Sequence, residues 1–399
     1  MQNKTKKILW GIVLVLLVAA GAFAYWWFVM RVPAPSEEPA GGAFPEFGTE
    51  GEFGELGGGE ESGAIDGDSA VEAPRLKQLT EGPVAGAVIF SRDGKVLVRY
   101  AERGTGHLFE MGVDDAEAKR ISNQTIPEIG EALWKPDGSG IIVRYAKEAV
   151  GTEYIESFYA NVPANATEDA PLRASFLPRN IHTIAFSPTG NTLFYLAENT
   201  AGSSGILAAP DGTRKSTLFD LPTKDLAAFW PVNDTVFLAT RAAVGAIGHL
   251  FAVGTQNGSP QTIASARGLT TLPNRTGALV LVGSSEDGGT ALSIHSRTTG
   301  SAVPLGLATV ADKCAWGKRV RTTAYCAVPD ALPSGAFLDN WYQGLAQTRD
   351  SLWTIDAEDG RANVLTDIST EAREDIDAFN MDISHDDQYL LFQNKNDLS

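Results

Sequence analysis

Short apolar runs recur along most of the chain, and each is followed by a tight turn and a second apolar run. The clearest examples span residues 87–101, 131–146 and 182–197. The turns fall near residues 91, 135, 187, 231, 273, 317 and 384, and five of the six spacings lie between 42 and 52 residues. Apolar runs of this length, separated by turn residues, predict a repeated antiparallel hairpin.

The residues of these turns favour the same interpretation. Residues 135–138 read KPDG, in which proline presets φ, aspartate bonds its own backbone and glycine tolerates a positive φ. A second hairpin follows in several units, for example at 205–219 and 249–263. Two hairpins make a four-stranded antiparallel sheet. We therefore predict that residues 76–399 form an all-β fold, a seven-bladed β-propeller with about 46 residues in each blade.

Three turns carry a resemblance to a known family. The sequences FSRDGK at 90–95, WKPDGS at 134–139 and FSPTGN at 186–191 resemble the repeats of TolB-like, WD-like bacterial β-propellers. The resemblance covers about 320 residues and implies the fold. Propellers of that family mostly bind partners or ligands, and some are fused to hydrolase domains.

The two ends of the repeat region bear on ring closure. Residues 76–80 precede the first unit and resemble the outermost strand of a unit, so we expect them to complete the last blade. The last unit supplies two strands, near 380–383 and 389–394, and shows no obvious third strand before residue 399. Two explanations stay open: an incomplete last blade or a truncated chain.

The first 75 residues are of a different composition. Residues 1–7 hold three lysines, whereas residues 8–30 hold no charge, and 23 residues at about 1.5 Å rise span about 34 Å. We predict a transmembrane helix at 8–30 with residues 1–7 as a cytoplasmic tip. A cleaved signal peptide is the alternative, because residues 22–24 resemble an A-x-A cleavage site.

Residues 31–75 are rich in glycine, glutamate and proline. Between 32 and 75 there are eleven acidic residues and one arginine, a net charge of −10. Such a composition buries too little apolar surface to offset its chain entropy and predicts a disordered acidic stalk. We therefore expect a single-pass membrane protein whose propeller lies outside the cytoplasm, at the cell surface or in the periplasm.

Composition limits the chemistry. The whole chain has 49 acidic and 32 basic residues, a net charge of −17, which argues against a nucleic-acid partner. Two cysteines and five dispersed histidines exclude a disulfide-dense or zinc-rich module. The sequence holds no G-x-S-x-G, P-loop or H-E-x-x-H motif. We therefore assign no catalytic residue, no metal site and no cofactor, and leave the oligomeric state open.

Cys314 and Cys326 lie on consecutive predicted strands of the sixth unit. A hairpin centred near Val320 places them directly opposite each other, close enough for a disulfide after a small adjustment. An extracytoplasmic domain is exposed to oxidising conditions, which favours that bond. Two buried free thiols are the alternative.

An insertion at 329–350 lengthens the sixth unit and gives the best local candidate for recognition. Aromatic and polar side chains of this mixture are enriched at binding sites. The candidate binding residues are Phe337, Asp339, Trp341, Tyr342 and Gln343. The alternative, which we favour, is a loop that packs its own aromatic side chains to cap the channel.

We therefore expect a binding or scaffolding module for an envelope protein, peptide or glycan. An alternative function is a surface hydrolase or lyase that uses carboxylates in the propeller channel. A third is a purely structural role as the cap of a larger assembly. Perturbed titratable groups that converge in the channel would favour the enzyme.

Overall fold

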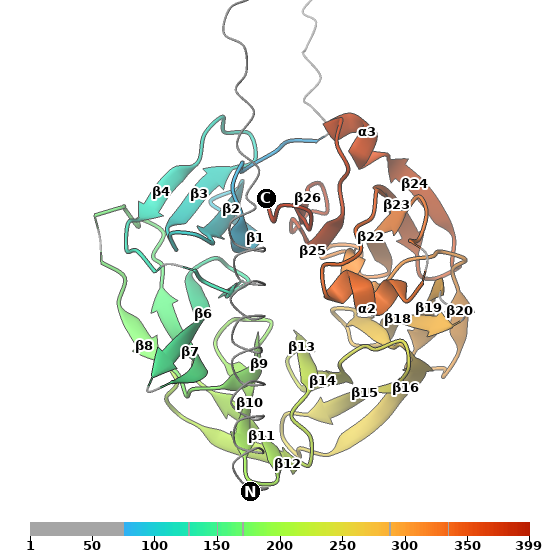
Figure 1. Cartoon of the computed structure of the whole chain (residues 1–399), viewed down its shortest axis with the longest axis horizontal. Coiled ribbons are helices and arrows are strands. Elements are labelled where there is room, and N and C mark those ends of the chain that lie inside the picture. Colours follow the sequence, from blue (N-terminus) through green and yellow to red (C-terminus); the bar gives the residue numbers. More distant parts are fainter. Residues whose placement is uncertain (1–75, 127, 150, 170, 287–288, 334) are drawn as a thin grey trace, which may run out of the picture. The chain divides into compact units, whose positions relative to one another are not determined.

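A computed structural model describes residues 76–399 except 127, 150, 170, 287–288 and 334. These residues form a ring of antiparallel sheets (Figure 1). The predicted tip at 1–7, transmembrane helix at 8–30 and stalk at 31–75 lie outside the described residues. Within the described part of the chain, no helix combines the length and apolar character needed to cross a membrane.

Six sheets have four strands each, and we number them blades 1–6 in chain order. Blade 1 is β1 (Val84–Arg92), β2 (Lys95–Glu102), β3 (Leu108–Gly112) and β4 (Lys119–Ser122). Blade 2 is β5 (Glu131–Trp134), β6 (Gly140–Ala149), β7 (Thr152–Asn161) and β8 (Ala174–Phe176). Blade 3 is β9 (Ile181–Phe186), β10 (Leu193–Asn199), β11 (Gly202–Ala208) and β12 (Ser216–Leu221).

The later blades follow the same order. Blade 4 is β13 (Leu226–Val232), β14 (Thr235–Thr240), β15 (Ile247–Gly254) and β16 (Pro260–Arg267). Blade 5 is β17 (Thr270–Pro273), β18 (Leu279–Glu286), β19 (Gly289–Ser296) and β20 (Ala302–Pro304). Blade 6 is β21 (Cys314–Trp316), β22 (Thr323–Pro329), β23 (Asp350–Asp356) and β24 (Ala362–Thr366). Three short helices accompany them: η1 (Ala311–Lys313), α2 (Phe337–Tyr342) and α3 (Ile368–Ala372).

The prediction of seven four-stranded blades is wrong. The seventh repeat forms only a two-stranded sheet, β25 (Ala378–Ile383) and β26 (Leu390–Asn394), so the ring has six blades and this hairpin. The residues after β26 turn back on it, with Leu398 N donating to Asn394 O at 2.7 Å, instead of running beside it as a third strand. Residues 76–80, expected as an outer strand, have no strand structure.

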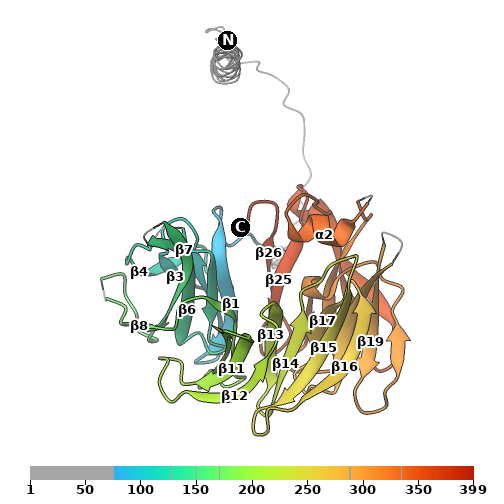
Figure 2. The ribbon, with the colours of Figure 1, turned by 60° about the horizontal axis from the view of Figure 1, so that its bottom comes forward.

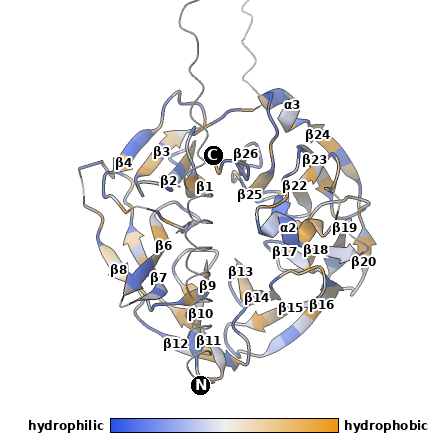
Figure 3. Ribbon diagram, in the orientation of Figure 1, coloured by the Kyte–Doolittle hydropathy of each residue, from blue (hydrophilic) through white to orange (hydrophobic). Residues whose placement is uncertain are grey.

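The apolar second strand of each repeat is buried, as its sequence predicts. Ile141 and Ile142 of β6, Phe194 of β10 and Phe237 of β14 have no exposed surface. Figure 3 marks apolar residues in orange and shows them along the strands of the blades. Burial of these side chains between neighbouring sheets is the main apolar contribution to stability.

Buried donors join neighbouring blades. Trp134 Nε1 donates to Gly86 O at 3.1 Å, and Trp316 Nε1 donates to Leu272 O at 2.8 Å. Both tryptophans end a first strand and reach the first strand of the preceding blade. The Arg99 side chain, 1% exposed, also bonds carbonyl oxygens of blade 2. First strands therefore line the centre of the ring, where neighbouring first strands such as β1 and β5 touch.

The two-stranded sheet closes the ring against β1. Val84 N donates to Leu398 O at 2.7 Å, and Gln393 Nε2 donates to Val84 O at 2.9 Å. Gln393 is 6% exposed, so its bond to the Val84 carbonyl lies away from solvent. The seam is thus closed by these hydrogen bonds and by the packing of Leu391 against the core of blade 1, and not by a shared four-stranded sheet.

Cys314 and Cys326 are directly opposite each other in the β21–β22 register, as their spacing predicts. Their sulfur atoms are joined in a disulfide, with an S–S distance of 2.06 Å. The bond links the two innermost strands of blade 6, next to the start of the insertion.

We predict that Gln393→Ala weakens ring closure. The Val84 carbonyl would lose its buried donor, which lowers the free energy of unfolding by about 1–3 kcal/mol. Urea denaturation of the full chain measures this, with Gln388→Ala in the exposed β25–β26 turn as the matched control. Equal urea midpoints for the two variants would contradict the closure described here.

Candidate functional site

A cavity of about 470 Å³ lies at one end of the central channel. Its walls come from the first strands β13, β17 and β25, from η1 with the start of β21, from α2 and from the residue after β26. Figure 2 shows α2 at one rim of the ring. The lining residues are Phe229, Thr271, Leu272, Ala311, Asp312, Cys314, Trp341, Tyr342, Phe379, Asn380, Met381 and Lys395. We call this space the channel-mouth cavity.

The insertion covers the cavity because its helix has one apolar face. Phe337 and Trp341 are 1% and 2% exposed and pack with Val310 and Phe379. The helix is also fixed to blade 4, since Val244 N donates to the Asp339 carboxylate at 2.9 Å. This side of α2 therefore acts as a structural cap, the role that the sequence favoured.

A buried charge cluster, formed by Lys313, Asp350 and Asp377, lies directly behind the cavity. None of the three side chains has exposed surface. The Lys313 ammonium is 2.7 Å from Asp350 Oδ2, is bonded to Asp377 and donates to Thr348 Oγ1 at 2.7 Å. Trp341 Nε1 lies 3.0 Å from Asp377 Oδ2. The cluster thus joins blade 6, the two-stranded sheet and α2.

The buried charge cluster is not fully satisfied by its own bonds. Asp350 Oδ2 also accepts from Ala378 N at 2.8 Å, but Oδ1 has no hydrogen-bond partner among the described residues. Burial raises the pKa of Asp350, and the charge of Lys313 opposes that rise. The Lys313 ammonium is therefore what allows a carboxylate at this depth.

Titratable groups of both signs face the channel-mouth cavity. Asp312 and Tyr342 both line the cavity, and the side chains of both retain exposed surface. Burial raises the pKa of Asp312, against the effects of the Tyr342 hydroxyl and Arg241. Burial and the charge of Asp312 raise the pKa of Tyr342. Burial lowers the pKa of Lys395, against the charge of Asp377.

A polar atom without a partner also lies on the cavity wall. Thr271 is 4% exposed, and its hydroxyl has no hydrogen-bond partner in the described structure. A buried hydroxyl without a partner is unfavourable by about 1–3 kcal/mol. The cavity thus offers a carboxyl group, an ammonium group and the exposed amide of Asn380 to a ligand, whereas the Thr271 hydroxyl has no accessible surface.

Only some of the five binding residues predicted from the insertion line the cavity. Trp341 and Tyr342 line the cavity, whereas Phe337 lies in the core and Asp339 binds the backbone of Val244. Gln343 is exposed at the end of α2 and does not line the cavity.

Sequence reasoning missed Thr271, Asp312 and Lys395. One signal was present: Asp312 and Lys313 directly precede β21, and Asp377 directly precedes β25.

The carboxylates of this region do not form a catalytic pair. Asp312 alone lines the cavity, because Asp350 and Asp377 are enclosed around Lys313. Among the residues that the structure describes, no group of three or more His, Cys, Asp or Glu side chains is arranged to hold a metal ion. The arrangement can bind a polar ligand and exchange a proton with it at Asp312 or Lys395.

Neither a protein-family model nor a curated protein sequence matches this chain. Solved structures similar to it include a puromycin-hydrolysing peptidase from Mycobacterium tuberculosis, with 16% identity, 72% of this chain and 47% of that chain covered and a TM-score of 0.49. TolB from Acinetobacter baumannii has 12% identity, coverage of 66% and 60%, and a TM-score of 0.42. An oligogalacturonate lyase in complex with manganese has 10% identity, coverage of 79% and 86%, and a TM-score of 0.48. The chain thus spans less than two thirds of the peptidase and of TolB.

We predict that Lys313→Met strongly destabilises the fold. The variant would leave Asp350 and Asp377 buried without a cation, which lowers the free energy of unfolding by about 3–5 kcal/mol. Lys147→Met is the control, because Lys147 is half exposed in its ion pair with Glu156 and should change stability by at most about 1 kcal/mol. Denaturant titration measures the free energy of unfolding of both variants. Similar losses of stability in the two variants would contradict a special role for Lys313.

Proposed function

We propose that the chain is a binding module whose channel-mouth cavity receives a peptide segment of a partner protein. The observation that carries the proposal is the composition of the cavity wall. Asp312 and Lys395 supply groups of opposite charge, and Asn380 supplies a neutral amide. A peptide presents the matching N–H and C=O groups.

The apolar part of the wall supports the same ligand class. Phe229, Leu272 and Phe379 line the cavity beside the polar groups, so an apolar side chain of the peptide would be shielded from water. The volume of about 470 Å³ is within the range of sites for small ligands, about 300–1,000 Å³. It suits a short segment and not a folded domain.

A second candidate function is acid–base chemistry in the same cavity. Asp312 and Lys395 have pKa values shifted toward their neutral forms, and groups shifted in this way gather at catalytic sites. A protonated carboxyl group can donate a proton and a neutral amine can accept one. The alternative expected from the sequence, a hydrolase or lyase that uses carboxylates in the channel, is thereby narrowed to Asp312, the single carboxylate on the described cavity wall.

We also propose that residues 8–30 anchor this module to a membrane and that the propeller lies on the extracytoplasmic side. The uncharged run of 23 residues after three lysines supports the anchor and its orientation. The Cys314–Cys326 disulfide supports an oxidising compartment.

A synthetic pool of random tripeptides tests the binding proposal. We expect the full chain to retain a subset of the pool, and mass spectrometry to identify it. Asp312→Asn should weaken the affinity for the best tripeptide at least tenfold, because a hydrogen bond to a charged group contributes about 1.5–3 kcal/mol. Asp234→Asn, in the exposed β13–β14 turn, is the control and should leave the affinity unchanged.

Three outcomes are informative in that experiment. Retention of no tripeptide, or an affinity indifferent to Asp312→Asn, contradicts peptide binding. If the chain retains members of a neutral oligosaccharide pool and no tripeptide, the result favours a glycan ligand. Cleavage of the retained tripeptide by the unaltered chain but not by Asp312→Asn supports the acid–base function.

Topology is tested by single cysteines and a membrane-impermeant maleimide on intact cells. The native cysteines do not react because they form a disulfide. Ser36→Cys, on the far side of the predicted helix, should be labelled without permeabilisation, whereas Thr5→Cys should be labelled only after it. Labelling of Thr5→Cys alone in intact cells, or equal labelling of both, would refute the proposed orientation.

A further inference from the structure

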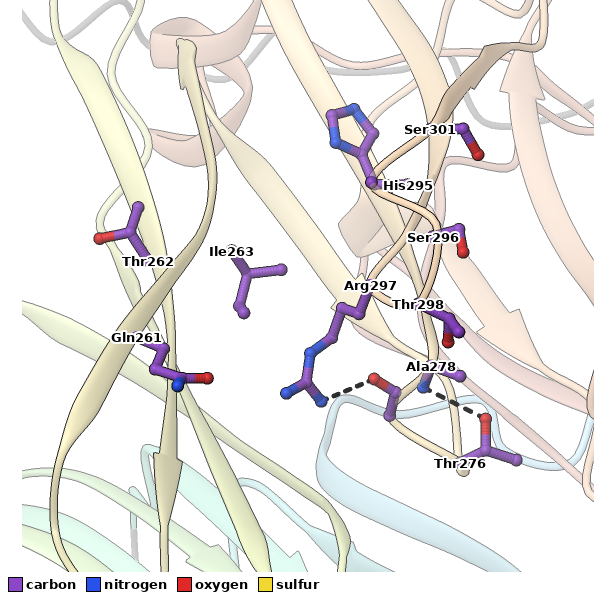
Figure 4. A pocket seen from close by; sticks show the side chains of 12 residues that line it. Gln261, Thr262, Ile263, Thr276, Ala278, His295, Ser296, Arg297, Thr298 and Ser301 are labelled. Atoms are coloured by element: carbon purple, nitrogen blue, oxygen red, sulfur yellow. Dashed lines mark hydrogen bonds between the residues drawn. The ribbon is translucent and has the colours of Figure 1, made fainter.

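A second cavity, of about 480 Å³, lies between blades 4 and 5 and is separate from the channel-mouth cavity. One wall is the start of β16, with Gln261, Thr262 and Ile263. The facing wall is made by the β17–β18 turn and the end of β19 with the β19–β20 turn. Figure 4 shows these side chains around the space between the two walls. We call it the interblade cavity.

Arg297 is the principal charge of the interblade cavity. One of its terminal nitrogens donates to Gly277 O at 2.8 Å, and its guanidinium lies 5.2 Å from the centre of the Phe237 ring. These two contacts fix the group in place. Figure 4 shows the guanidinium extended into the cavity, toward Gln261 and Ile263.

No carboxylate neutralises this guanidinium in the described structure. Arg297 forms no salt bridge there, and none of the lining residues is acidic. Arg361, in the β23–β24 turn, is by contrast paired with Asp359. In a chain of net charge −17, a fixed and unpaired arginine inside a cavity points to an anionic ligand.

The remaining lining groups indicate which kind of anion the interblade cavity would bind. The amide of Gln261 extends into the same space, and Ser296, Thr298 and Ser301 line the wall beside Arg297, whereas the Thr262 hydroxyl is directed to the other side of β16. Burial lowers the pKa of His295, so its ring is a neutral donor and acceptor near pH 7. Such a set suits a ligand that carries several hydroxyl groups, and a volume of about 480 Å³ accommodates a single sugar ring.

We propose that the interblade cavity binds an anionic monosaccharide, with Arg297 on its carboxylate or phosphate and the hydroxyl-bearing side chains on its ring. The site does not depend on the peptide proposed for the channel mouth. It shares no lining residue with that cavity.

Calorimetry with the full chain tests the proposal with four probes: glucuronate, glucose 6-phosphate, glucose and inorganic phosphate. We expect saturable binding of at least one sugar anion, and binding at least tenfold weaker for both glucose and inorganic phosphate. Glucuronate alone identifies a carboxylate ligand, and glucose 6-phosphate alone a phosphate ligand; either supports the proposal.

Four variants locate the binding. Arg297→Gln should weaken the affinity at least tenfold, whereas Arg267→Gln, on β16 outside the cavity, should leave it unchanged. Gln261→Ala lies on the exposed outer strand and should weaken binding about threefold without a risk to folding. Asp312→Asn should have no effect, which separates this site from the channel mouth.

The proposal is overturned if neither sugar anion binds, if inorganic phosphate binds as tightly as the sugar phosphate, or if glucose binds as tightly as the anions. It is also overturned if folded Arg297→Gln and Gln261→Ala both retain full affinity.

Discussion

The ammonium group of Lys313, buried between Asp350 and Asp377 with no surface exposed to solvent, is the central contact of this molecule. Two carboxylates at this depth are tolerated only beside a buried cation. The three charged residues come from separate segments of the chain. Lys313 lies at the start of blade 6, Asp350 lies where the chain returns from the insertion, and Asp377 lies at the start of the two-stranded sheet. The cluster therefore fixes the seventh hairpin beside blade 6, where no complete seventh blade exists to do so.

The same cluster shapes the channel-mouth cavity. Trp341 donates to Asp377 on one side and lies 5.3 Å and 5.1 Å from the ammonium groups of Lys313 and Lys395. Its ring thus contacts both the buried charge cluster and a lysine that lines the cavity. Asp312, next to Lys313 in the chain, lines the cavity instead. Two neighbouring residues of the chain therefore lie in different environments, one enclosed in the charge cluster and one on the cavity wall.

Much of the architecture could be predicted from the sequence, and the reasons are local. Turn residues and apolar second strands predicted all seven hairpins, because both signals lie within about fifteen residues. The number of complete blades could not be predicted, since it depends on how residues 395–399 pack against Asn394 and Val84. The candidate site could be predicted only in part. The aromatic insertion is visible in the sequence, whereas Lys313, Asp350 and Asp377 are far apart in the chain and meet only after the ring has formed.

The most direct test of this account is a double-mutant cycle between Lys313 and Asp377. The free energies of unfolding of Lys313→Met, Asp377→Leu and the double variant are compared with that of the unaltered chain. A shared buried ion pair predicts a coupling free energy of about 2–3 kcal/mol, with the double variant more stable than the sum of the single losses implies. Losses that add to within about 0.5 kcal/mol would show two independent sites and contradict the account.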